Sequence, residues 1–154
     1  MANVETMTGA PQVEATPHAT RSSILAVIAP LGRVLFAAIF VMSGFTHFSQ
    51  ATVGYAASSG VPLASVLVPF SGVLAIVGGL SVAIGLRARW GALLLAIFLV
   101  PVTLSMHAFW SVSDPAAHMA QQAHFMKNVA LLGCALLVAW FGSGPYSIDH
   151  HDHA

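Results

Sequence analysis

Four long apolar segments divide this chain, with polar stretches between them. They run from about Ile24 to Phe48, Leu63 to Leu86, Trp90 to Trp110 and Ala123 to Phe141. A helix of about 20 mostly apolar residues crosses the hydrocarbon core of a bilayer. Unpaired backbone polar groups cannot face lipid, so each segment is expected to be helical. The pattern therefore predicts an all-α fold, an integral membrane four-helix bundle.

The polar stretches define the remaining organisation. Residues 1–22 are expected to form a disordered polar tail, 23–142 the membrane domain, and 143–154 a solvated, His-rich C-terminal tail. The stretch SQATVGYAASSGVP between the first two segments is rich in small residues and has room for a short interfacial helix. Only Arg87, Ala88 and Arg89 separate the second and third segments, which predicts a tight hairpin.

The composition indicates that lipid rather than water surrounds most of the chain. Only 6% of the 154 residues are charged and 57% are hydrophobic, whereas soluble domains carry about 25% charged residues. A chain this small has too much surface for its volume to hide so many apolar side chains from water. The lipid bilayer is therefore the expected partner. A formal net charge of +0 gives no indication of a nucleic-acid partner, and the single cysteine, Cys134, excludes a disulfide within the chain.

Basic residues indicate how the chain is oriented. Arg21, Arg33, Arg87 and Arg89 fall on one side of four alternating spans, and Lys127 falls on the other. Cytoplasmic loops of membrane proteins are enriched in lysine and arginine. The imbalance predicts that both termini are cytoplasmic.

Small residues predict how the helices pack. The second span carries a small residue at every fourth position, a stripe that lets helix backbones approach closely. The stripe consists of Ser71, Ala75, Gly79 and Ala83. Ser43 and Gly44 are expected to play the same part in the first span. The bundle is expected to be compact and able to form a homo-oligomer.

Polar side chains gather where three of the spans begin or end. The first span ends at His47, the third carries His107 near its end, and the fourth begins with His124, Lys127 and Asn128. Because successive spans run in opposite directions, these helix ends are expected to meet at one face of the membrane. Ionisable side chains within spans usually face the bundle interior and mark functional sites. The sequence therefore predicts an outward-facing pocket.

The predicted pocket combines hydrogen-bond donors with aromatic surface. Tyr55, Phe109 and Asp114 are expected to contribute to it. A flat ligand with polar edges, such as a quinone head group, would accept hydrogen bonds from histidine or lysine and stack on the aromatic rings. The expected ligand-binding residues are His47, His107, Trp110, His124, Phe125, Lys127 and Asn128.

Plainer alternatives remain open for the same residues. Lysine, histidine and aromatic side chains near helix ends commonly anchor to lipid head groups. Metal binding by the histidines is a weaker alternative, because their spacing matches no recognised ligand motif, and no metal site is predicted. Arg33, three residues after Pro30, is expected to extend to cytoplasmic head groups. If the first span instead starts at Ile24, the charge of Arg33 is buried and needs a partner. Arg87 and Arg89 are expected to be interfacial.

Three stretches carry a resemblance to a known family. GRVLFAAIFVMSGFTHF, SMHAFW and QQAHFMKNVALLGCALLVA resemble the DoxX family of small four-span membrane proteins, over about residues 30 to 142. The resemblance implies a bacterial inner-membrane protein, multi-pass, with a link to quinone or sulfur redox chemistry. The positions that it carries over are Arg33, His47, His107, Trp110, Phe125, Lys127 and Asn128.

Two functions from different classes follow. The first is a quinone-linked oxidoreductase subunit, in which His107, His124 and Lys127 hold a quinone and a partner redox subunit delivers electrons. The second is a non-enzymatic accessory or assembly factor that docks a partner protein. A small transporter has the least support, because no charged residue lies at mid-membrane depth and no inverted repeat is detected. The chain has no CxxC pair, which excludes dithiol chemistry within one chain.

Overall fold

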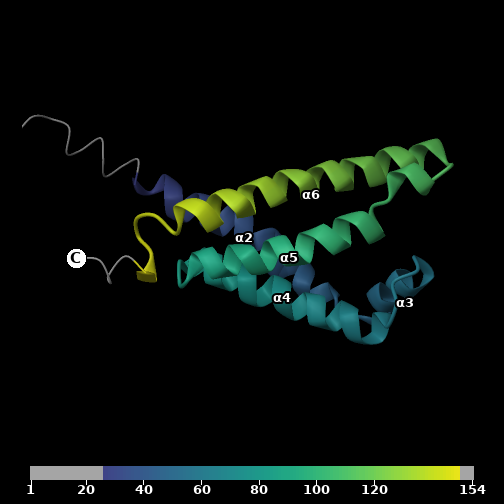
Figure 1. The fold of residues 1–154 in the computed structure, drawn as a ribbon, viewed down its shortest axis with the longest axis horizontal. Coiled ribbons are helices and arrows are strands. Elements are labelled where there is room, and N and C mark those ends of the chain that lie inside the picture. Colours follow the sequence, from purple (N-terminus) through teal and green to yellow (C-terminus); the bar gives the residue numbers. More distant parts are fainter. Residues whose placement is uncertain (1–25, 150–154) are drawn as a thin grey trace, which may run out of the picture.

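The structure is a computed structural model that describes residues 26–149. Within this range the chain forms α-helices and one short 3₁₀ helix, η1 (Figure 1). The elements are α2 (Ile28–Thr46), α3 (Gln50–Ser58), α4 (Ala64–Ile84), α5 (Ala88–Met106), η1 (Phe109–Ser111) and α6 (Pro115–Phe141). The expected N-terminal tail, Arg21 and the end of the expected C-terminal tail, residues 150–154, lie outside the described residues.

Four helices in the described range are long and apolar enough to cross a membrane, namely α2, α4, α6 and the unit of α5 with η1. The predicted all-α fold with four spans is therefore confirmed. α3 confirms the short helix expected in the first loop, and Ser49 caps it, because its hydroxyl oxygen accepts a hydrogen bond from the Thr52 N–H at 3.2 Å. The cytoplasmic placement of the termini stays a prediction.

The helices pack around α4 and α5. α4 contacts α2, α3 and α5, and α6 packs along α5, whereas direct contact between α6 and α2 is sparse. The core includes Phe40 of α2, Val82 of α4, and Leu95 and Leu99 of α5. Figure 1 shows α3, η1 and the start of α6 at one end of the bundle, called the α3 end below. The α4–α5 turn and the residues that follow α6 lie at the opposite, terminal end.

Glycines let α4 approach both of its long neighbours. A Cβ atom on Gly72 would lie 2.8 Å from the carbonyl oxygen of Gly44 in α2 and 2.8 Å from the Cβ of His47. A Cβ atom on Gly78 would lie 2.9 Å from the carbonyl oxygen of Gly91 in α5. The close backbone approach predicted from small residues in the first two spans is therefore present.

Replacing Gly72 by alanine is expected to lower the free energy of unfolding by on the order of 1 kcal/mol, because the new methyl group meets backbone rather than a flexible side chain. Gly133→Ala is the matched control. Gly133 of α6 has open space around it, and alanine is the better helix former. Thermal unfolding of both variants in detergent measures the difference. Equal melting temperatures would contradict the tight crossing of α2 and α4.

The last span begins earlier than expected, at Pro115 rather than near Ala123. Asp114 is its N-cap, and the carboxylate accepts a hydrogen bond from the Ala117 N–H at 2.8 Å. Proline in the first turn is favoured because its missing N–H would have no partner there. Asp114 therefore serves the start of α6 rather than the predicted pocket.

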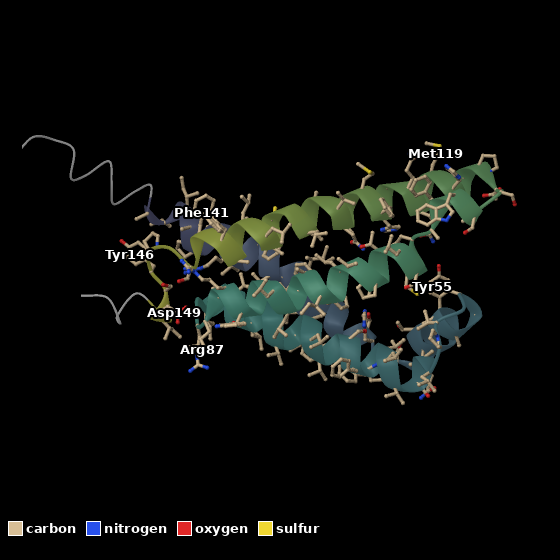
Figure 2. All side chains as sticks on the ribbon, in the orientation of Figure 1. Tyr55, Arg87, Met119, Phe141, Tyr146 and Asp149 are labelled. Atoms are coloured by element: carbon tan, nitrogen blue, oxygen red, sulfur yellow. The ribbon has the colours of Figure 1, made fainter. Side chains whose placement is uncertain are left out.

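Residues 143–149, called the strap below, fold back over the terminal end, where Figure 2 labels Tyr146 and Asp149. Arg33 lies beneath the strap and is 6% exposed. Its Nη1 donates hydrogen bonds to the carbonyl oxygens of Ser143 and Pro145, and its Nη2 donates to that of Tyr146 at 2.6 Å. The expected extension of Arg33 to head groups is therefore wrong. The alternative, a buried charge with partners, describes the structure.

The far end of the strap is fixed to the α4–α5 turn. The Asp149 carboxylate accepts hydrogen bonds from the backbone N–H groups of Arg87 at 2.9 Å and Ala88 at 3.3 Å. The Asp149 N–H donates to the Gly85 carbonyl at 3.1 Å. A carboxylate at the start of a helix satisfies free N–H groups and complements the helix dipole. The strap thus joins α2 to the start of α5, and the side chains of Arg87 and Arg89 stay exposed.

Candidate functional site

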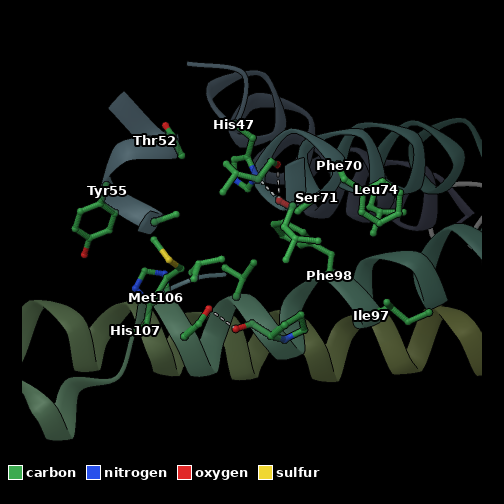
Figure 3. A pocket seen from close by; sticks show the side chains of 17 residues that line it. His47, Thr52, Tyr55, Phe70, Ser71, Leu74, Ile97, Phe98, Met106 and His107 are labelled. Carbon is green, nitrogen blue, oxygen red and sulfur yellow. Dashed lines mark hydrogen bonds between the residues drawn. The ribbon is translucent and has the colours of Figure 1, made fainter. Parts of the chain in front are cut away.

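A cavity of about 430 Å³ lies between α3, α4 and α5 at the α3 end (Figure 3). We call it the α3 cavity. Figure 3 shows His47 beside Ser71 on one side of it and His107 beside Met106 on another. Its remaining walls are largely apolar. The polar residues that line it are His47, Thr52, Tyr55, Ser71, Ser105 and His107.

The α3 cavity reaches the outer surface of the bundle. Phe70 of α4 and Ile97 of α5 both line it, and they are 57% and 62% exposed. Both residues belong to spans, so their exposed surface faces the hydrocarbon of the bilayer. The α3 cavity therefore adjoins the lipid-facing surface of the bundle.

His47 directly follows α2 and lies against α4 and α5. Its Nδ1 is 2.8 Å from Ser71 Oγ, and the Ser71 hydroxyl donates to the Val68 carbonyl at 2.7 Å. The His47 ring lies 5.6 Å from the ring of Phe98, measured between centroids. Gly72 makes this position accessible, because any larger residue there would meet the Cβ of His47. The histidine is therefore held by both a hydrogen bond and packing.

His107 follows α5 and links three elements at the α3 end. Its Nδ1 is 2.8 Å from Oε1 of Gln121 in α6. The Gln121 Nε2 in turn donates to the hydroxyl oxygen of Tyr55 in α3 at 3.3 Å. The His107 ring also stacks on the exposed ring of His124, with centroids 5.2 Å apart and planes 23° apart. This chain of contacts fixes the orientation of the His107 ring.

A smaller cavity of about 130 Å³ lies between α2, α5 and α6. We call it the seam cavity, because it follows the sparse contact between α2 and α6. His47 and His107 line both cavities, whereas Lys127 and Asn128 line only the seam cavity of the two. Asn128 is buried at 5% exposure, and Lys127 is exposed overall. The structure thus brings together four of the predicted pocket residues, and ligand binding by them stays a prediction.

Of the other residues predicted for the pocket, Tyr55 lines the α3 cavity, whereas Trp110, His124 and Phe125 line neither cavity. Trp110 and Phe125 pack edge-to-face with each other at 5.8 Å, and Phe125 packs in the same way on Phe109 at 5.4 Å. Trp110 is 59% exposed. His124 reaches the site only through its stacking on His107. We refer to Phe109, Trp110 and Phe125 as the aromatic cluster.

The roles of Ser71 and Gln121 did not emerge from the sequence. Ser71 fits a stripe of small residues, so the pattern indicates helix packing rather than a hydrogen bond to His47. Gln121 precedes the apolar part of α6, and only the early start of α6 gives it a fixed place beside His107. Within the described residues, no group of three His, Cys, Asp or Glu side chains is placed to hold a metal ion.

The family match covers the part of the chain that lines the α3 cavity. The DoxX family model matches residues 28–108, from the start of α2 to the end of α5. The chain belongs to the DoxX family. Every residue that lines the α3 cavity lies within this DoxX segment, whereas His124, Lys127 and Asn128 lie beyond it.

Two curated relatives support the same assignment. The chain is 26% identical over 125 residues to the inner membrane protein YphA of Escherichia coli K12, which covers 80% of this chain and 89% of YphA. It is 30% identical over 121 residues to the inner membrane protein YqjF of the same organism, which covers 77% of this chain and 87% of YqjF. No solved structure matches the chain. With its four spans, this DoxX protein is a multi-pass inner membrane protein.

Proposed function

We propose that this DoxX protein binds a quinone in the α3 cavity. The observation that carries the proposal is a largely apolar cavity of about 430 Å³ that is reached from the lipid-facing surface and holds two fixed histidines. Small-molecule sites typically enclose about 300 to 1,000 Å³, with apolar walls and a few placed polar groups. The seam cavity, at about 130 Å³, is smaller than such sites.

The parts of the α3 cavity match the parts of a quinone. The polar edges of the ring would meet His47 and His107, and Phe98 would pack against the ring. An isoprenoid tail would leave past Phe70 and Ile97 into the bilayer, because apolar surface in a span is solvated by lipid. The ligand's own partition into the membrane would raise its local concentration at this opening.

In such a role the chain would act as a quinone-linked redox subunit. Its single cysteine gives it no dithiol with which to carry electrons. Electrons would therefore pass between the bound quinone and a partner redox subunit, and the quinone would supply the redox chemistry. The histidines would bind the ring and exchange its protons, since imidazole titrates near neutral pH.

Quinone binding is tested by thermal unfolding of the purified protein with and without short-chain ubiquinone and menaquinone analogues. At a ligand concentration of 100 times Kd, the bound state is expected to gain about 2.7 kcal/mol. His107→Leu is expected to remove most of this gain, because it leaves the edge of the ring without a polar partner. His118→Leu is the matched control, because His118 packs on Phe109 and lines neither cavity.

The variant Lys127→Ala distinguishes ligand binding in the α3 cavity from ligand binding in the seam cavity. Lys127 lines only the seam cavity of the two, so the gain is expected to persist in this variant. Its loss in Lys127→Ala would move the ligand to the seam cavity, which Lys127 lines. No gain with any analogue, in protein shown to be folded, would favour an accessory protein that docks a partner at the exposed aromatic cluster.

A further inference from the structure

The hydrogen bonds around the two histidines define which form of a ring compound the α3 cavity accepts. We propose that the cavity selects the reduced, hydroxyl-bearing form of the ring compound, a hydroquinone. This preference rests on the proposed quinone site. His47 and His107 both line the cavity, and the partners of Nδ1 described below leave the lone pair of each ring on Nε2. A hydroquinone donates from both of its oxygens, whereas the carbonyl oxygens of a quinone only accept.

Ser71 sets the protonation of His47. A serine hydroxyl carries one proton, and Ser71 donates it to the Val68 carbonyl at 2.7 Å. The 2.8 Å contact between Ser71 Oγ and His47 Nδ1 therefore has the histidine N–H as its donor. A neutral imidazole has only one N–H, so Nε2 of His47 keeps its lone pair.

Gln121 sets the protonation of His107 in the same way. The Gln121 amide nitrogen donates to the Tyr55 hydroxyl at 3.3 Å, which leaves its carbonyl oxygen beside His107 Nδ1 at 2.8 Å. A carbonyl oxygen only accepts, so His107 Nδ1 carries the proton and Nε2 keeps its lone pair. Both histidines reach the same tautomer through unrelated partners on different helices.

The other polar groups of the α3 cavity do not reverse this preference. Ser105 donates its proton to the Pro101 carbonyl at 2.7 Å, so its hydroxyl is not available as a donor. Thr52 and Tyr55 carry hydroxyls that can donate or accept, and so they suit either form of the ring. The Lys127 ammonium, a donor only, lines the seam cavity rather than the α3 cavity. The two imidazoles therefore decide the selectivity.

Selectivity is measured by titrating the full-length protein anaerobically with duroquinone and with durohydroquinone kept reduced by dithionite. The titration is carried out at pH 8, above the ordinary imidazole pKa of about 6.5. The Kd for durohydroquinone is expected to be lower by at least about tenfold, because the quinone oxygens would face two acceptors. Isothermal titration in detergent, with dithionite in the matched blank, gives both constants.

Ser71→Ala tests the origin of the selectivity. Without the hydroxyl, Nδ1 of His47 loses its partner at 2.8 Å, and the ratio of the two dissociation constants is expected to fall, with binding retained. Ser105→Ala is the matched control, because Ser105 lines the same cavity but bonds only to Pro101, and it is expected to keep the wild-type ratio. A merely structural role of Ser71 would weaken both forms together.

The outcomes separate this inference from the proposed function. Tighter binding of durohydroquinone that depends on Ser71 supports both. Equal affinities, or tighter binding of duroquinone, would overturn the selectivity and leave the quinone site in place. A preference that survives Ser71→Ala unchanged would overturn the assigned role of His47. Failure of both compounds to bind would overturn the proposed site itself.

Discussion

Removal of residues 143–154 is expected to destabilise the bundle by about 1.5 to 3 kcal/mol, the cost of removing hydrogen-bond acceptors from a charged group. The strap supplies the carbonyl oxygens that accept hydrogen bonds from Arg33. Arg33 lies on α2 beneath the strap with 6% of its surface exposed, so these carbonyl oxygens take the place of water around its charge. Among the described residues its Nε already has no hydrogen-bond partner. Thermal and denaturant unfolding in detergent measure the loss.

The contribution of Arg33 to this loss is isolated by a double-mutant cycle. In an Arg33→Leu background the same truncation is expected to cost far less, because no charge is left unpaired. Removal of residues 150–154 alone is the matched control, since it keeps every strap residue that contacts Arg33. A truncation cost that is equal with arginine and with leucine would show that the strap acts through other contacts, such as the Asp149 cap on α5.

The strap also shows what a local pattern cannot predict. Hydropathy indicates where a chain enters the bilayer, and it predicts all four spans. The same measure makes the segment GSGPYSID resemble a solvated tail, because most of its residues are small or polar. Its role depends on Arg33, which is more than a hundred residues away in the chain. Such a pairing is a property of the packed bundle.

For the candidate site, too, the sequence predicts which residues lie at one end of the bundle but not how they pack. The alternation of spans is enough to predict that His47, His107, Lys127 and Asn128 lie at one end, and the structure brings them together. It is not enough to show that the two histidines stand between two cavities. That arrangement depends on how closely α2 approaches α4 at Gly72 and on the loose contact between α2 and α6. Side-chain packing decides both.

Leu67→Trp is expected to abolish the stabilisation by quinone analogues, about 2.7 kcal/mol at 100 times Kd, while the protein stays folded. Leu67 of α4 lines the α3 cavity and is exposed on the surface of the bundle. An indole at this position has lipid-facing room, so the fold tolerates it, and it covers the opening beside Phe70. The measurement is the ligand-dependent shift in melting temperature, supported by isothermal titration.

Val66→Trp is the matched control, because Val66 is the neighbouring exposed residue of α4 and does not line the α3 cavity. It adds the same indole at nearly the same membrane depth, so general effects of tryptophan on the bundle or the detergent appear in both variants. Loss of the ligand-dependent shift in Leu67→Trp alone would place the ligand's entrance at the lipid-facing wall of the α3 cavity. An unchanged shift in both variants would mean that the ligand enters elsewhere, and the seam between α2 and α6 is then the other opening to block.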